Sequence, residues 1–201
     1  MPGYVLVTAE GSYDNVVSAP GGTKFFVDTE FDPERHRTTV GRVVAVSDVS
    51  GDIGFATVFQ WLGPIEVAPG DRVHFHYHSV TEDSCYLIGG ERCWRIPYAH
   101  LIARVDGDGA VEPLCGRILV ERGRDERVAT RGGLTAGGII IPGHSASQSS
   151  ETRGVVRHVH PDVTAVAPGD EVFFREIAAD EYEIAGAPYL CMYEDDILAL
   201  A

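Results

Sequence analysis

Basic residues, cysteines and long apolar runs are all scarce in this chain, and each scarcity excludes a class of protein. Lysine and arginine number 16 against 30 aspartates and glutamates, which gives a formal net charge of -14 at pH 7. So acidic a chain is repelled by phosphate backbones and anionic lipid, and we expect no nucleic acid and no membrane among its partners. The N-terminus lacks a basic leader and no apolar run reaches membrane-spanning length, which predicts a cytoplasmic location.

The motifs of disulfide-rich scaffolds and of common enzymes are missing as well. The chain has only four cysteines, Cys85, Cys93, Cys115 and Cys191, and no Cys-x-x-Cys pair, so we expect free, buried thiols. No GxxxxGK[ST] or GxGxxG motif follows a strand into a helix. We therefore expect that the chain does not hydrolyse ATP itself.

Helical periodicity is the next absence, and it sets the fold class. With 201 residues, 44% of them hydrophobic, the chain has room for one large or two small cores. No segment shows the apolar spacing of an amphipathic helix of three turns, whereas short β-branched segments bounded by Gly, Pro and Asp are frequent. We predict an all-β fold of closed or nearly closed antiparallel barrels.

An internal repeat sets the domain organisation. The pentapeptide Val-Ala-Pro-Gly-Asp occurs at 67–71 and at 166–170, and we interpret both copies as tight turns. Further blocks recur in the same order, namely 5–7 with 118–120, 41–44 with 154–157, and 101–103 with 197–199. This order indicates a tandem duplication. The turn formers at 106–109 mark its seam, so we predict domains at 1–106 and 107–201.

The halves differ in one insertion and in one connection. Residues 48–63 of the first half read as an additional hairpin, expected either to pack into the core or to form a contact surface. In the second half, Ile139, Ile140 and Ile141 interrupt a long polar and glycine-containing run from Arg122 to Thr152. Such a triplet is either a short buried strand or the apolar part of a functional loop.

Several blocks of the second half follow one another at specific spacing: 113–120, the GGIIIPG run at 137–143, 152–156, the VAPGDEVFF run at 166–174, and 189–199. With these blocks the second half resembles the GroES-type co-chaperonins along essentially its whole length. The first half resembles a more divergent copy, with 21–29 in the loop position. The tandem form is similar to versions found in some bacteriophage and bacterial genomes.

The resemblance implies two tandem GroES-like, partly open β-barrels, each with a long loop, and a roof-like hairpin in the first half. It implies a homo-oligomeric ring that caps a GroEL-type chaperonin in its nucleotide-bound state and assists protein folding. Unfolded substrate proteins would be partners only indirectly. The chain would be no enzyme and would have no cofactor of its own, since ATP would be bound by the chaperonin and not by this chain. A ring of seven domains cannot be built from whole pairs. Either the second domains are stacked or the ring uses an even number of domains.

The resemblance also implies which residues dock. In that family a short hydrophobic tripeptide in a mobile loop binds the chaperonin. In the second half this tripeptide falls on Ile139, Ile140 and Ile141, with loop hinges at Gly137, Gly138 and Gly143. In the first half, the equivalent tripeptide falls on Phe25, Phe26 and Val27. A self-assembling ring that serves something other than a chaperonin is a second interpretation.

One motif favours a different function. His76, His78 and Glu82, followed by Gly89, fit the first metal-binding motif of the cupin superfamily, which is also a β-barrel. Two histidines and a glutamate on neighbouring strands could hold Fe, Mn or Zn for catalysis, and His74 extends the same strand face. The second cupin motif is missing. The cupin-like enzyme therefore stays an alternative to plain histidines on a barrel strand.

Overall fold

The predicted all-β architecture is confirmed by the computed structural model, which describes residues 3–10, 16–18, 22–26, 38–47, 63–123, 151–175 and 179–201. Within these ranges, the regular elements are β-strands and three-residue 3-10 helices, with no α-helix. None of the helices in the described ranges is long and apolar enough to cross a membrane. The chain divides into two compact units, Met1–Cys115 and Gly116–Ala201. Of the predicted roof-like hairpin at 48–63, residues 48–62 lie outside the described residues.

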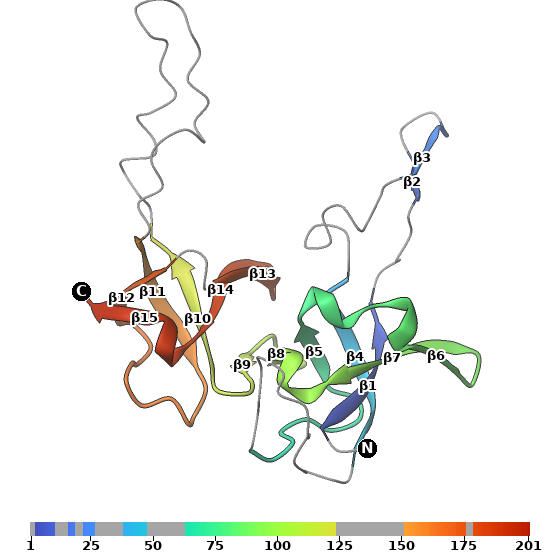
Figure 1. Ribbon diagram of the computed structural model, residues 1–201, viewed down its shortest axis with the longest axis horizontal. Coiled ribbons are helices and arrows are strands. Elements are labelled where there is room, and N and C mark those ends of the chain that lie inside the picture. Colours follow the sequence, from blue (N-terminus) through green and yellow to red (C-terminus); the bar gives the residue numbers. More distant parts are fainter. Residues whose placement is uncertain are drawn as a thin grey trace, which may run out of the picture. The chain divides into compact units, whose positions relative to one another are not determined.

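The first unit is built on a seven-stranded antiparallel sheet in the order β6-β7-β1-β4-β5-β8-β9 (Figure 1). Its strands are β1 (Tyr4–Ala9), β4 (Val40–Val46), β5 (Arg72–Phe75), β6 (Cys85–Ile88), β7 (Glu91–Pro97), β8 (Leu101–Val105) and β9 (Val111–Pro113). A two-stranded sheet pairs β2 (Val16–Ser18) with β3 (Lys24–Phe26). The 3-10 helices are η1 (Tyr77–Ser79), η2 (Glu82–Ser84) and η3 (Tyr98–His100).

The second unit repeats this topology with a six-stranded sheet in the order β13-β14-β10-β11-β12-β15. Its elements are β10 (Arg117–Arg122), β11 (Glu151–Val159), β12 (Glu171–Arg175), β13 (Asp180–Ile184), β14 (Ala187–Tyr193), the 3-10 helix η7 (Glu194–Asp196) and β15 (Ile197–Leu200). Each strand takes the place of its counterpart in the first sheet, so β6 corresponds to β13 and β8 to β15. The tandem repeat predicted from the sequence is thus a repeat of the fold.

The repeated pentapeptide makes the same turn in both units, as predicted. Gly70 and Gly169 both have a φ of +100°, a left-handed conformation that glycine adopts without steric cost. The Gly70 N–H donates to the Val43 carbonyl and the Gly169 N–H to the Val156 carbonyl, each at 2.8 Å. The turn therefore starts β5 and β12 while it is tied to β4 and β11.

A second shared detail is a close approach of two strands. A Cβ added to Gly41 of β4 would lie 2.4 Å from the Thr8 carbonyl oxygen, and one added to Gly154 of β11 would lie 2.4 Å from Val120 Cγ1. Both glycines face a strand whose register shifts within the same Leu-Val step, at Leu6 in β1 and at the corresponding residue of β10. The bulge and the glycine were therefore duplicated together.

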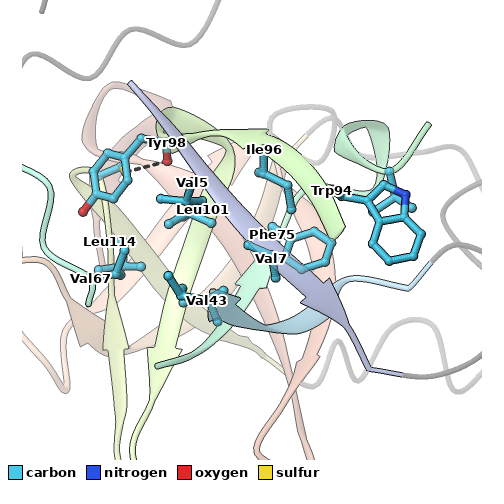
Figure 2. Packing of buried hydrophobic residues seen from close by; sticks show 13 residues of the cluster. Val5, Val7, Val43, Val67, Phe75, Trp94, Ile96, Tyr98, Leu101 and Leu114 are labelled. Atoms are coloured by element: carbon cyan, nitrogen blue, oxygen red, sulfur yellow. Dashed lines mark hydrogen bonds between the residues drawn. The ribbon is translucent and has the colours of Figure 1, made fainter. Parts of the chain in front are cut away.

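The core of the first unit is formed mainly by buried residues of β1, β4, β5, β7 and β8. Figure 2 shows Val5 and Val7 of β1 packed with Phe75 of β5 and Ile96 of β7, all of them buried. Along β1 and β4 buried residues alternate with half-buried or exposed ones, as follows from the two-residue period of a strand. The second core repeats the pattern with Ile118, Val120, Val156, Val172, Phe174, Leu190 and Met192.

Along the chain, the boundary between the two compact units lies after the one that the sequence indicated. The run of turn formers at 106–109 is the tight turn between β8 and β9, where the Gly109 N–H donates to the Asp106 carbonyl at 3.2 Å. Leu114 and Cys115 then close the first core. Residues 107–115, which we assigned to the second domain, thus lie in the first compact unit. A hairpin turn and a linker share the same residue types, so composition does not separate them.

All four cysteines are free, in agreement with the expectation from their spacing. Cys93, Cys115 and Cys191 are buried, whereas Cys85 is half-buried. Burial raises the pKa of the Cys191 thiol, and the nearby Arg117 guanidinium only partly opposes this. The thiol therefore stays protonated at neutral pH and has the character of a packing residue.

Candidate functional site

The candidate docking segment of the first unit lies in the connection between β1 and β4. Phe25 and Phe26 belong to β3, where the register pairs them with Val17 and Val16 of β2. The Phe25 side chain is 55% exposed, so a large apolar ring is available for contact with another molecule. Val27 lies outside the described residues.

Polar contacts close the base of this connection. The Glu10 N–H donates to the Val40 carbonyl at 2.7 Å, and the Thr38 hydroxyl donates to the Glu10 carbonyl at 2.6 Å. The Glu10 carboxylate accepts a hydrogen bond from Arg72 Nε at 2.9 Å and lies 3.9 Å from Arg42 Nη2. Exposed ion pairs of this kind stabilise little by themselves. Together with the backbone bonds they fix both ends of the connection on the sheet.

A buried histidine belongs to the same region. His74 of β5 pairs with Val40 of β4 and is 2% exposed, and neither ring nitrogen has a hydrogen-bond partner among the described residues. Burial, with the charge of Arg72, lowers the pKa of His74 to about 4, while Glu10 opposes the shift. The imidazole is therefore neutral at pH 7 and acts as an apolar spacer with unpaired polar atoms.

The corresponding connection of the second unit joins β10 to β11, and its base is held in a similar way. The Gly123 N–H donates to the Arg153 carbonyl at 2.8 Å. The Arg153 guanidinium forms an ion pair with Glu171 of β12, and Arg157 forms one with Glu121 at 2.6 Å. Each unit therefore presents one long connection between two anchored ends at the same place in the sheet order.

The strongest sequence prediction falls inside this connection. Residues 124–150 lie outside the described residues, and they include Ile139, Ile140, Ile141, Gly137, Gly138 and Gly143. What the structure provides for them is the backbone position of Gly123 and Glu151, the described residues on either side. Their role in docking stays a prediction.

The histidine motif does not form a metal site among the described residues. The expectation that His76 lies on a strand with His74 is wrong, because β5 ends at Phe75 and His76 caps the 3-10 helix η1. The His76 Nδ1 atom accepts a hydrogen bond from the His78 N–H at 3.2 Å, and the two rings stack with centroids 5.0 Å apart. In the described ranges no three His, Cys, Asp or Glu residues are placed to hold a metal. The cupin-like alternative, which also needs Glu82, has no support.

Comparison with known proteins settles the family. Residues 110–201 match the family described as "Chaperonin 10 Kd subunit". The co-chaperonin GroES of Coxiella burnetii (strain Dugway 5J108-111) is 35% identical over 99 residues, which is 45% of this chain and 95% of that protein. The chain belongs to this family. The co-chaperonin GroES of Oleidesulfovibrio alaskensis is 36% identical over 99 residues, again 45% of this chain and 96% of that protein.

Membership in the co-chaperonin family gives the two sheets a common interpretation. The match begins at Ala110, before β9, and runs through β15. The first unit has the same strand order and the same turns, so the chain is a tandem pair of GroES-like β-barrels. The segment of this co-chaperonin-family chain that matches includes the whole connection with the isoleucine triplet.

Sequence reasoning missed two exposed apolar surfaces. One is formed by Tyr86, Leu87 and Ile88 of β6, and the other by Leu198 and Leu200 of β15. Apolar residues in a strand pattern are read as core, and period alone does not distinguish a covered strand from an uncovered one. A comparison of the two repeats could have revealed the first surface. Glu183 stands where the first half has Leu87, and a charged residue indicates an exposed position.

Proposed function

We propose that the chain is a co-chaperonin that caps a GroEL-type chaperonin ring in its nucleotide-bound state and thereby assists protein folding. The observation that carries the proposal is the family match over 110–201, which contains Ile139, Ile140 and Ile141. These three side chains are the docking residues, and Gly137, Gly138 and Gly143 serve as hinges. The anchored ends at Gly123 and Arg153 would hold such a segment in a constant position.

The energetics of the proposal are those of many weak contacts. Burying an isoleucine side chain stabilises a complex by roughly 1.5 to 3 kcal/mol, and the ordering of a long loop offsets part of this. A single loop therefore binds weakly. A homo-oligomeric ring presents many loops at once, and every attachment after the first is effectively intramolecular. Such a cap binds firmly and still releases when the affinity of each contact falls.

In this proposal the chemistry belongs to the partner. The chaperonin binds ATP, and this chain acts in the cytoplasm as a non-enzymatic component that meets unfolded substrate proteins only indirectly. The first unit adds a second docking segment at Phe25, Phe26 and Val27. The exposed ring of Phe25 favours that role.

The test is a binding experiment with a purified GroEL-type chaperonin, with and without nucleotide. We expect binding only with nucleotide, and we expect Ile139→Ser, Ile140→Ser and Ile141→Ser in one chain to weaken it by more than about 100-fold. Phe25→Ser with Phe26→Ser is the matched comparison in the other unit. Circular dichroism controls for folding. Full binding by the triple variant would overturn the docking assignment.

A further inference from the structure

Two arginines face each other near the end of the connection between β1 and β4. Arg42 of β4 and Arg72 of β5 are directly opposite each other in the register of the two strands. Like charges at directly opposite positions destabilise a strand pair, because their side chains start only about 5 Å apart. The pair is therefore favourable only if an acidic group lies between the two guanidinium groups.

Glu10, the residue after β1, supplies this acidic group. One of its carboxylate oxygens accepts a hydrogen bond from Arg72 Nε at 2.9 Å, and the other lies 3.9 Å from Arg42 Nη2. The Nη1 atom of Arg42 donates a further hydrogen bond to the Gly70 carbonyl at 2.9 Å. The cluster therefore joins the end of β1 to β4, to β5 and to the turn that precedes β5.

The main chain of the same residue binds the returning end of the connection. The Glu10 N–H donates to the Val40 carbonyl at 2.7 Å, and the Glu10 carbonyl accepts from the Thr38 hydroxyl at 2.6 Å. Because the carboxylate is held by two strands while the main chain holds the returning end, Glu10 fixes the distance between both ends of the connection. A loop with fixed ends reaches fewer positions than a loop with free ends.

The second unit is built differently at this place. Gly123 stands where the first unit has Glu10, and a Cβ added to it would lie 2.8 Å from the Arg153 carbonyl oxygen, so a side chain does not fit. Glu171 stands where the first unit has Arg72, and its carboxylate pairs with Arg153 of the neighbouring strand β11. This ion pair joins β11 to β12, and the chain leaves β10 through a glycine.

We propose that Glu10 is a positioning residue for docking by the first unit. Its carboxylate holds the base of the connection, so that Phe25 and Phe26 reach a partner from a restricted set of positions. A restricted segment has a higher effective concentration at its binding site and loses less conformational entropy on binding. The two docking segments of one chain are thereby not equivalent. The inference deepens the proposed function and rests on it for the identity of the docking residues.

Lys24 allows a test without a chaperonin, because it is the only lysine in the sequence. It is exposed and is the first residue of β3, where it pairs with Ser18 of β2. Endoproteinase Lys-C cleaves after lysine, so it cuts the full chain at the Lys24–Phe25 bond alone. A protease acts on chain that has left its paired conformation, so the cleavage rate reports how readily the connection opens. Glu10→Gly, which introduces the residue of the second repeat, is expected to accelerate cleavage by about 5-fold.

A double variant separates positioning from the relief of charge repulsion. In Glu10→Gly with Arg72→Glu, position 72 carries the acidic residue of the second repeat, which attracts Arg42 across the strand pair. The melting temperature of the double variant is expected to return to the wild-type value. Its cleavage is expected to stay fast, because no side chain ties the end of β1 to β4 and β5. Recovery of the wild-type cleavage rate would show that Glu10 only neutralises the two arginines, and would overturn the positioning role.

A double-mutant cycle on chaperonin binding tests whether Glu10 acts through the docking residues. With nucleotide present, Glu10→Gly is expected to weaken binding to a purified GroEL-type chaperonin by about 5-fold. In a chain that carries Phe25→Ser and Phe26→Ser, the same change is expected to have no further effect. Glu112→Gly, which removes an ion pair with Arg104 in the same sheet, is the matched control and should change neither cleavage nor binding.

Three results would contradict the positioning role of Glu10. They are a Glu10→Gly chain that is cleaved at the wild-type rate, one that binds the chaperonin like the wild type, and one whose binding is weakened equally with and without the two phenylalanines. A wild-type chain that binds no chaperonin would overturn the proposed function instead. The cleavage experiment does not depend on that function, so the two failures are distinguishable.

Discussion

The first and second units have the same scaffold and different surfaces. Strand order, bulges and the Pro-Gly turns agree in detail. The units differ in the identity of particular side chains at equivalent positions. Leu87 and His74 of the first unit stand where the second has Glu183 and Phe173. Duplication thus preserved the positions that backbone geometry requires, whereas side chains at other positions diverged, both at exposed Leu87 and at buried His74.

The largest expected effect tests whether the two cores are equivalent. Phe75 and Phe174 occupy matching places in β5 and β12, and both are fully buried. Phe75→Ala and Phe174→Ala each remove a buried ring and leave a cavity, so each should lower the free energy of unfolding by about 3 to 5 kcal/mol. Denaturant titrations followed by circular dichroism measure this. A difference of more than about 2 kcal/mol between the variants would show that the cores are packed differently.

An intermediate effect separates the units by pH. The pKa of His74 is about 4 in the folded chain, below its ordinary value of 6.5. As pH falls, the unfolded chain therefore takes up a proton before the folded chain does. The free energy of unfolding is therefore highest, as far as His74 is concerned, above about pH 6.5. It falls by at most about 3 kcal/mol as the pH decreases toward 4.

The control for this pH effect comes from the other repeat. His74→Phe introduces the residue that β12 carries as Phe173. Urea midpoints at pH 7.5 and pH 5 should differ less in this variant than in the wild type. An unchanged difference would assign the acid sensitivity to other groups.

The smallest effect is expected at the repeated turn. Ala at position 70 or 169 would have to adopt the positive φ that Gly70 and Gly169 adopt, at a cost of about 1 to 2 kcal/mol. Within the described ranges, no atom lies within 4 Å of a Cβ added at either site, so the strain is conformational and not a steric clash with a neighbour. Equal shifts in melting temperature for Gly70→Ala and Gly169→Ala are expected. Unequal shifts would show that the turns are not equivalent.

The parts of the fold that were predictable have local signals. A Pro-Gly pair fixes a turn because each residue restricts or permits particular φ values, and β-branched runs between turns indicate strands. The sequence did not predict that β9 belongs to the first unit, since the residues of the turn at 106–109 are equally typical of a linker. Which strand pairs with which depends on contacts distant in sequence.

The candidate site also has features that the sequence predicts and features that it does not. Phe25 is exposed, but its role in docking stays a prediction, as does the assignment of Ile139, Ile140 and Ile141. The spacing of His76 and His78 indicated a strand. Spacing alone does not show that the His76 ring caps a 3-10 helix at this point. The exposed edges escaped notice because apolar strands look alike whether or not something covers them.

The place of β9 has a consequence for how the chain is made. The first sheet takes its last strand, Val111–Pro113, from residues that belong to the second repeat by sequence. During synthesis from the N-terminus, the ribosome must therefore begin the second repeat before the first unit has all its strands. Until then the outer edge of β8 has no strand paired to it and can pair with a strand of another protein. The folding of the first unit therefore depends on synthesis of the beginning of the second repeat.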